Sequence, residues 1–295
     1  MSPVLVGLLG FTGTVGSALL PPLIEAHKSN KIDLVILHRE SSNTSQIPSD
    51  LGITFRAVQL DDKGEKKNRE AVKDLEVVIS ALGATAIDSQ KYLIEALAGS
   101  SKLKTFIPSD FGFTFTEEEL SYPALKPLQL KKEIADIAGK MNVPITNVRV
   151  GLFDYYFYAY KFAGTDVKEN TVEVYHDALK NPLRITSLAY LGHAITQLSL
   201  RPSAIAGKTI ALYDLQPTGQ EIIDVLTKIH GKPTKVTDYT DEQYEKDMGD
   251  LVSAISASVK LKWGDNSWAK EEKVEVDGWK NKSFEELTRA FLKGN

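Results

Sequence analysis

The sequence predicts an α/β fold in which a doubly wound parallel sheet is interleaved with a smaller, α-rich part. Short apolar segments alternate with helix-like segments over roughly the first 150 residues, which is typical of such a sheet. A turn with evenly spaced glycines follows the first apolar segment, and the alternation weakens after Phe153. We therefore expect one domain over residues 1–153 and a second over residues 154–295.

Composition excludes several classes of function. The chain has 295 residues, of which 42% are hydrophobic and 25% charged, enough for one large domain or two unequal ones. Its formal net charge of -4 argues against direct binding to nucleic acid or anionic lipid. No cysteine is present, which suits a reducing compartment, so we expect the cytoplasm, with the nucleus as the alternative. No two of the five histidines stand four residues apart, and we expect no structural metal.

The stretch from Pro3 to Ile24 carries no charge and is long enough to raise the possibility of a membrane span, which needs roughly 20 apolar residues. Glycine recurs every third residue within it, however, and the pair Pro21–Pro22 interrupts it. No Lys or Arg precedes it, as a signal peptide would require. We interpret it as a buried strand, a glycine turn and a helix.

The first half contains six expected strands, at residues 3–10, 31–40, 53–62, 75–84, 103–112 and 143–153. Helical periodicity is found at residues 17–28, 88–100 and 124–141. Ligands of a doubly wound sheet bind at the carboxyl ends of its strands. The loops after Gly10, Leu37, Leu82 and Ile107 are therefore expected to surround one cleft.

The second half is expected to form a smaller, α-rich substrate-binding region. Residues 171–187 suggest short strands, residues 188–200 a helix, and residues 208–214 a strand that returns to the sheet. Three further helices are expected to begin at capping boxes, one of them continuing over residues 240–257; the boxes are Thr218 with Glu221, Thr240 with Gln243, and Ser283 with Glu286.

The turn "GFTGTVG" is expected to bind the pyrophosphate of a dinucleotide. Gly10 permits the turn, Gly13 lets backbone N–H groups approach a phosphate, and Gly16 lets the helix pack close to the strand. The spacing is G-x-x-G-x-x-G rather than the usual G-x-G-x-x-G, and a tight strand–helix joint without a ligand is the alternative. The expected contacts are Gly10, Thr12, Gly13, Thr14, Val15 and Gly16, with Leu82 and Gly83 from the loop after the fourth strand.

The end of the second strand bears on the choice of cofactor. A carboxylate there favours NAD, whereas an arginine accommodates the extra phosphate of NADP. The sequence "LHRES" places Arg39 at this point, with Ser42 as a further phosphate donor. Glu40 could instead bind a ribose, and Arg39 could be a solvated surface residue. The sequence favours NADPH/NADP, with NAD as the alternative.

Several motifs together resemble a family of atypical short-chain dehydrogenases, which includes the NmrA-like proteins and the plant isoflavone and phenylcoumaran benzylic ether reductases. They are "GFTGTVG", "LHRES", "VVISALGA", "FIPSDFG", and "PIT" leading into "GLFDYY". The first motif is common to many families, whereas "IPSDFG" followed by a lysine-bearing helix and "GLFDYY" is more particular. The resemblance covers nearly the whole chain and implies an NAD(P)-binding Rossmann fold.

The resemblance implies a catalytic lysine about 13 residues before Pro144, which is Lys131; Lys132 is the neighbour that a one-residue slip would select. An ammonium beside the nicotinamide can bind the ribose, stabilise an oxyanion or donate a proton. A solvated surface lysine is the alternative. The Tyr-x-x-x-Lys pair of classical short-chain dehydrogenases is absent, because Pro127 stands four residues before Lys131.

The resemblance also implies that Phe153 packs beside the nicotinamide, although a purely structural role in the core is the alternative. Gly151 stands where the plant reductases have asparagine. Around the cleft, we expect the substrate to meet Ser109, Asp110, Phe111 and Tyr156, the last as part of an aromatic cluster that is otherwise core.

Two functions follow as expectations. The first is an NADPH-dependent reductase that transfers hydride to a carbonyl or activated double bond of a small aromatic or phenolic compound. The second is an NmrA-like, NAD(P)-binding redox sensor that acts through a protein partner without turnover. A sensor has no need of an ammonium beside the nicotinamide, so Lys131 favours the enzyme.

Overall fold

A five-stranded parallel sheet forms the centre of the first half. The computed structural model describes residues 2–294 and gives the strand order β3-β2-β1-β4-β5, with every pair parallel. The strands are β1 (Val4–Leu9), β2 (Ile32–His38), β3 (Thr54–Ala57), β4 (Val77–Ser80) and β5 (Thr105–Ile107). The chain starts in the middle of the sheet and winds outward in both directions, so the predicted doubly wound fold is confirmed.

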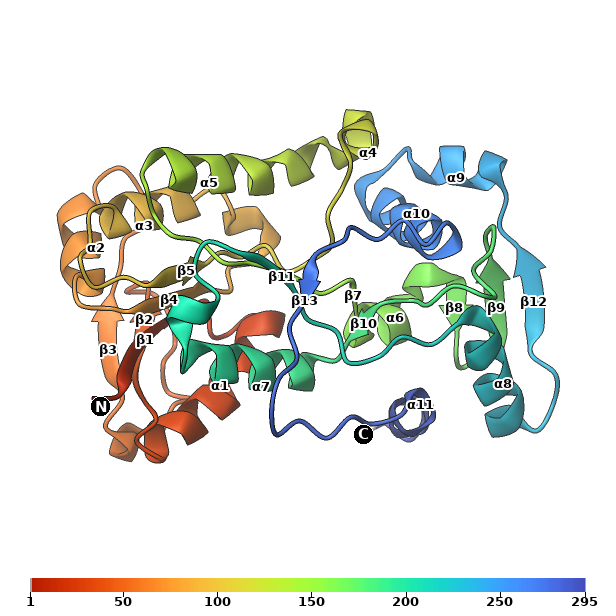
Figure 1. The fold of residues 1–295 in the computed structure, drawn as a ribbon, viewed down its shortest axis with the longest axis horizontal. Helices are drawn as coiled ribbons and strands as arrows, with labels where there is room; N and C mark the ends of the chain where they lie inside the picture. The colour runs from red at the N-terminus through yellow and green to blue at the C-terminus, as the bar shows by residue number, and fades with distance from the viewer. Residues whose placement is uncertain (1, 295) are drawn as a thin grey trace.

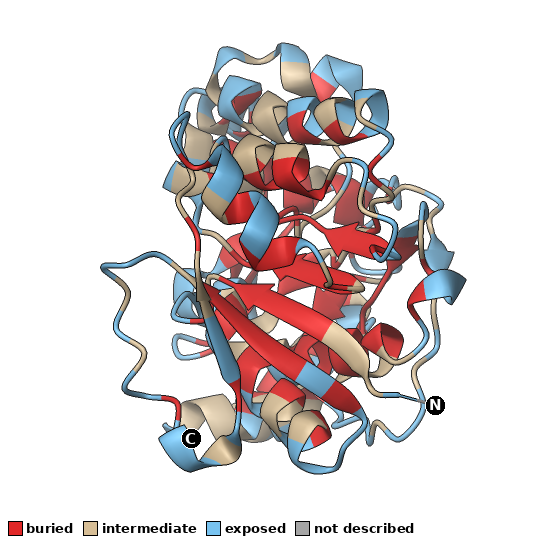
Figure 2. Ribbon diagram, turned by 90° about the vertical axis from the view of Figure 1, so that its left-hand side faces the viewer, coloured by how far each residue is buried: buried red, intermediate tan, exposed pale blue. Residues whose placement is uncertain are grey.

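Helices cover both faces of this sheet (Figure 1). On one face lie α2 (Glu65–Val72), α3 (Gln90–Leu97) and α5 (Gln129–Lys140); on the other lie α1 (Thr14–Lys28) and α7 (Leu188–Ser199). The edge strand β3 has no buried residue, whereas β1, β2, β4 and β5 are mostly buried (Figure 2). Burial on both faces explains why the sequence shows these strands as apolar runs without alternation.

The close packing of α7 on α1 depends on a proline and a glycine. Pro22 has no N–H, so the carbonyl of Ala18 in the middle of α1 loses its intrahelical donor. That carbonyl lies against Gly192 of α7, where an added Cβ would be only 2.3 Å from the Ala18 oxygen. A helix from the second half is thereby fixed directly onto the first.

The expected sixth strand is interrupted. Residues 143–153 form β6 (Asn147–Arg149) and β7 (Leu152–Phe153), separated at Gly151, whose φ is +67°. An added Cβ at Gly151 would lie 2.6 Å from the carbonyl oxygen of Arg184, so the close approach of that segment requires glycine. The prediction of one continuous strand was therefore wrong.

The chain returns twice to the side of β6. Strand β11 (Thr209–Ala211) pairs with β6 in parallel, and β13 (Glu272–Lys273) pairs with β11 in parallel. Main-chain hydrogen bonds at Phe106 of β5 join the central sheet to residues 144–146, just before β6. Two segments of the second half, β11 and β13, thus lie beside β6, near the end of the first half of the chain.

The second half forms a smaller body around two short sheets (Figure 1). One contains β8 (Thr165–Asp166), β9 (Thr171–Val174) and β12 (Lys235–Asp238); the other pairs β7 with β10 (Ile185–Thr186). Five helices of the second half belong to this body, and α4 (Glu117–Ser121) of the first half packs with them. The five are α6 (Asp154–Tyr160), α8 (Gly219–His230), α9 (Asp241–Asp247), α10 (Leu251–Gly264) and α11 (Phe284–Leu292). Short 3-10 segments lie at Ser49–Leu51, Ala84–Ala86, Pro123–Leu128, Phe162–Gly164 and Pro202–Ala204.

The three predicted capping boxes are confirmed at the starts of α8, α9 and α11. The helix expected over residues 240–257 is instead two helices, because the Asp250 carboxylate accepts the N–H groups of Val252 and Ser253 and starts a new one. Over residues 2–294, none of the helices is both long and apolar enough to cross a membrane.

Candidate active site

The glycine turn joins β1 to α1 and touches the loop after β4. Gly10 has a φ of +86°, and an added Cβ there would lie 2.5 Å from the Ala81 carbonyl oxygen; at Gly16 it would lie 2.0 Å from the Gly10 oxygen. Both residues are therefore required by the joint itself. Gly13 differs, because an added Cβ would find its nearest neighbour at 3.6 Å. Packing does not require Gly13 to be glycine, and its exposed backbone is open to a ligand.

The N-terminus of α1 has the features of an anion site. Gly13 occupies the N-cap position and supplies no capping side chain, and the first turn contains no acidic residue. N–H groups in the first turn of a helix have no intrahelical acceptor, and the helix dipole favours a negative charge beside them. Thr12 and Thr14 are exposed at this end. These residues fit a pyrophosphate.

The loop after β2 exposes Arg39. The N–H of Ser42 donates to the Arg39 carbonyl at 2.9 Å, which closes a turn. Glu40 forms an ion pair with Lys67 of α2, and the hydrogen bond from Lys67 lowers the pKa of Glu40. The carboxylate that would otherwise favour an unphosphorylated ribose is thus bound to another side chain.

Ser109 connects the loops after β4 and β5. It is 7% exposed, and its Oγ lies 3.0 Å from the carbonyl oxygens of both Ser80 and Leu82. Its N–H donates to Gln90 Oε1 at 2.7 Å. The hydroxyl expected beside the substrate therefore fastens one loop to the other. Gly83 remains exposed on the outer side of the same loop.

A cluster of charges follows β5. Lys131 Nζ, from α5, lies 3.2 Å from Asp110 Oδ1, and Arg149 Nη1, from β6, lies 2.6 Å from Asp110 Oδ2. The Asp110 side chain is only 10% exposed, and Lys131 also lies against Gly112, where an added Cβ would be 3.4 Å from Nζ. Lys132 points to a different environment, since it pairs with Glu117 at the surface. Arg149 was not anticipated from the sequence.

Phe153 and Tyr156 lie side by side, with ring centroids 6.4 Å apart. Phe153 is 7% exposed and belongs to the same core cluster as Phe11 and Ala81 beside the glycine turn, with Phe111 packed against that cluster. Tyr156 is 39% exposed and stacks on Phe162. Three tyrosines of α6 form an exposed aromatic surface next to Phe153: Tyr155, Tyr156 and Tyr160.

Asp154, the residue after Phe153, is a half-buried carboxyl group that sequence reasoning missed. Its Oδ1 accepts the N–H groups of Tyr155 at 2.8 Å and Leu188 at 3.2 Å. Burial raises the pKa of Asp154 to about 6, and these two hydrogen bonds only partly oppose the effect. Burial also raises the pKa of the nearby Asp214.

Comparison with known proteins assigns the chain to a family. The model of the NmrA-like family matches residues 4–283. This chain belongs to the NmrA-like family. The family resemblance inferred from the sequence motifs is therefore confirmed.

Curated relatives of this NmrA-like chain match over part of its length. An isoflavone reductase homolog A622-like protein from Nicotiana tabacum is 27% identical over 155 residues, which cover 51% of this chain and 49% of the relative. A probable pinoresinol-lariciresinol reductase 3 from Arabidopsis thaliana is 28% identical over 146 residues, covering 50% and 46%. The chain spans about half the length of the curated relatives it matches.

Solved structures match the NmrA-like chain from end to end. An isoflavone reductase superimposes with a TM-score of 0.78 at 20% identity, covering 98% of this chain and 99% of the other. The complex of leucoanthocyanidin reductase with NADPH from Vitis vinifera gives a TM-score of 0.77 at 16% identity, with the same coverage. The TM-scores show a shared Rossmann-type fold, and at identities this low the likeness extends to the fold alone.

Proposed function

We propose that the chain is an NADPH-dependent reductase acting on a carbonyl or activated double bond of a small aromatic or phenolic compound. The observation that carries the proposal is the ammonium of Lys131, held by the buried carboxylate of Asp110 at the carboxyl edge of the sheet that also bears the glycine turn. Relatives and structural neighbours that carry reductase names, one of them in complex with NADPH, support it.

The residues expected to hold NADPH come from the loops after β1, β2 and β4, from the start of α1, and from β7 and α5. The N–H groups at the start of α1 would bind the pyrophosphate, and Arg39 with Ser42 would bind the 2′-phosphate. The complete set is Gly10, Thr12, Gly13, Thr14, Val15, Gly16, Arg39, Ser42, Leu82, Gly83, Lys131 and Phe153. When bound, the reduced nicotinamide supplies a hydride.

Reduction of a carbonyl would transfer a hydride, that is a proton with two electrons, from NADPH to carbon and a separate proton to oxygen, leaving an alcohol and NADP+. Lys131 is the residue that can stabilise the negative charge on that oxygen and deliver the proton. Asp110 holds the ammonium, and both of its carboxylate oxygens are engaged, one by Lys131 and one by Arg149. We therefore assign Asp110 to orienting Lys131 rather than to contact with the substrate.

The exposed tyrosines of α6 support an aromatic substrate. Tyr156 lies against Phe153, so a ring bound over Tyr156 would be adjacent to the expected nicotinamide position. Tyr155 and Tyr160 extend the same surface, with a distance of 3.3 Å between their hydroxyl oxygens. Offset or edge-to-face contacts with a phenolic ring stabilise such a complex by about 0.5–1.5 kcal/mol per ring pair.

The test begins with binding of NADPH, NADP, NADH and NAD to the wild type and to Arg39→Ala. We expect NADPH to bind best, and the substitution to weaken it on the order of 10- to 100-fold while sparing NADH, because a charge-assisted contact is lost. Equal affinity of the wild type for NADPH and NADH would contradict the cofactor assignment.

Turnover of aromatic ketones, quinones and enones then separates the enzyme from the sensor. Lys131→Ala should abolish turnover while NADPH still binds. Lys132→Ala is the matched control, since Lys132 is paired at the surface with Glu117, and it should retain wild-type activity. Tight binding that discriminates oxidised from reduced cofactor, with no turnover of any compound, would favour the NmrA-like sensor acting through a protein partner.

A further inference from the structure

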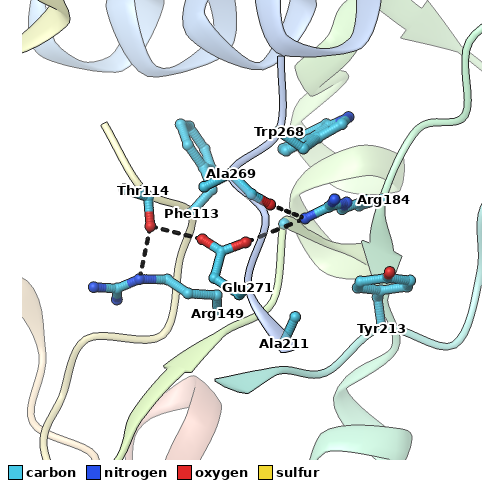
Figure 3. A pocket seen from close by; sticks show the side chains of 10 residues that line it. Phe113, Thr114, Arg149, Arg184, Ala211, Tyr213, Trp268, Ala269 and Glu271 are labelled. Atoms are coloured by element: carbon cyan, nitrogen blue, oxygen red, sulfur yellow. Dashed lines mark hydrogen bonds and ion pairs between the residues drawn. The ribbon is translucent and has the colours of Figure 1, made fainter. Parts of the chain in front are cut away.

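The charge cluster at Asp110 continues into the second half of the chain. Arg149 binds Asp110 twice through Nη1, at 2.6 Å to Oδ2 and 3.0 Å to the main-chain oxygen. Arg149 Nε donates to Thr114 Oγ1 at 3.1 Å, and that hydroxyl donates to Glu271 Oε1 at 2.8 Å. Because the Thr114 hydroxyl accepts on one side and donates on the other, the chain of hydrogen bonds has one direction (Figure 3).

Glu271 is itself firmly placed. Its side chain is 8% exposed, and Arg184 Nη1 reaches Glu271 Oε2 at 3.3 Å and the Ala269 carbonyl oxygen at 3.0 Å. The Arg184 guanidinium also lies over the rings of Tyr213 and Trp268, 5.2 Å and 5.7 Å from their centroids. This end of the network therefore has little freedom to move, unlike an exposed ion pair.

Charges alternate along the whole row, from Lys131 through Asp110, Arg149 and Glu271 to Arg184. The space enclosed by the labelled residues of Figure 3 is about 10 Å³, no more than one water requires. The side chains thus contact one another directly and leave no room for a larger ligand. Their arrangement is suited to holding side chains in place.

We propose that Glu271 is a positioning residue for Lys131. By binding Thr114, and through it Arg149, Glu271 keeps the guanidinium on Oδ2 of Asp110 and leaves Oδ1 for the Lys131 ammonium. Without Glu271, the Thr114 hydroxyl is no longer held against Arg149, and Arg149 competes with Lys131 for the carboxylate of Asp110. The role in turnover rests on the proposed function, whereas the effect on Lys131 itself does not.

The first readout needs neither cofactor nor substrate. The folded protein is treated with limiting acetic anhydride, and acetylation of Lys131 relative to Lys132 is measured by mass spectrometry. An ammonium held by a buried carboxylate reacts slowly, so release of Lys131 raises the ratio. We expect Glu271→Ala to raise it at least about twofold, the lower end of coupling within such networks. Asp110→Asn is the positive control.

Two further variants separate the network from a general loss of structure. Thr114→Val removes only the linking hydroxyl and should raise the ratio in the same way, whereas Thr114→Ser keeps the hydroxyl and should restore the wild-type ratio. Glu272→Ala is the matched control, because Glu272 has the same charge one residue along and is exposed. It should leave the ratio unchanged.

On a compound that the wild type reduces, Glu271→Ala should lower kcat while leaving the KM for NADPH unchanged. A ratio of Lys131 to Lys132 labelling that stays at the wild-type value in both Glu271→Ala and Thr114→Val, while Asp110→Asn raises it, overturns the proposal. That outcome leaves the proposed function intact. Failure of the proposed function is detected separately, by absent NADPH binding or by full activity of Lys131→Ala.

Discussion

A buried ion pair joins the two halves of the molecule, and its contribution to stability can be tested directly. Lys262 Nζ of α10 lies 2.8 Å from the carboxylate of Glu119 in α4, and their side chains are 3% and 6% exposed. Glu119 also accepts the Thr116 N–H at 2.6 Å and so closes the capping box of α4. The same carboxylate thus fixes a local helix start and a long-range contact.

Replacing Lys262 by methionine keeps the length of the side chain and removes its charge, which leaves the Glu119 carboxylate buried without a cation. Breaking a buried pair in this way destabilises proteins by about 3–5 kcal/mol. Adding Glu119→Gln removes the second charge and retains an acceptor for Thr116. The double variant Lys262→Met/Glu119→Gln should therefore be more stable than the single variant Lys262→Met, by about 1–3 kcal/mol.

The free energy of unfolding is measured by urea titration, followed by circular dichroism and by tryptophan fluorescence to test for two-state behaviour. Lys132→Met is the control, because the exposed pair of Lys132 with Glu117 should contribute less than about 1 kcal/mol. If Lys262→Met costs no more than Lys132→Met, or if the double variant is less stable than Lys262→Met, the reasoning from burial is refuted.

Three further predictions concern stability. Gly192→Ala should separate α7 from α1 and destabilise by about 1–3 kcal/mol, because its Cβ would meet the Ala18 oxygen at 2.3 Å; Gly139→Ala, at an open helical position, is the control in the same denaturation assay. Burial raises the pKa of Asp154 from 3.8 to about 6, so ionising this carboxyl destabilises the fold increasingly between those two pH values and by a constant amount above them. Asp154→Asn should therefore nearly match the wild type at pH 4 and be more stable by up to about 3 kcal/mol at pH 8; equal stability at both pH values would contradict this. Burial opposes ionisation of His176, but hydrogen bonds to Asp265 and Asp241 raise its pKa above 6.5. The contribution of the protonated ring to the stability of the fold is therefore complete below pH 6.5 and is lost as pH rises through the raised pKa. His176→Asn should lower the melting temperature more at pH 6 than at pH 9.

The central sheet was predictable because its signals are local. A parallel strand buried on both faces appears as an apolar run, as at Leu34–Leu37, and the glycine turn after β1 has a fixed spacing. Capping boxes are equally local, since a box such as Thr218 with Glu221 spans only one helical turn. Such patterns need no knowledge of the rest of the chain.

Other features depend on contacts between distant segments. The break at Gly151 follows from the approach of Arg184; a glycine inside a strand pattern indicates a bulge or a close backbone approach but does not identify the partner. Strand β12 is exposed along its whole length, so its sequence "KVTD" lacks both an apolar run and a buried face. The split between α9 and α10 was within reach, because Asp250 is a favoured N-cap residue following a glycine.

The candidate site divides in the same way. Lys131 was located by its distance from Pro144 in the family pattern, and α5 places it against Asp110. Arg149 appeared in the sequence only as a charged residue within an apolar strand. A charge at such a position has to be paired when the strand is buried, and this requirement is itself a signal, although it does not identify the partner.

The row of charges from Lys131 to Arg184 crosses the domain boundary proposed at residue 153, so the two halves are not independent at the candidate site. Glu271 and Arg184 come from the second half, yet they hold a side chain of β6, which in turn holds the carboxylate beside Lys131. Helix α7 covers the central sheet, and β11 pairs with β6. Because the second half covers one face of the central sheet, pairs with β6 and supports Lys131, a change in its packing reaches the candidate site without any contact with cofactor or substrate. Substitutions far along the sequence should therefore be judged by their connection to this row rather than by the half of the chain in which they fall.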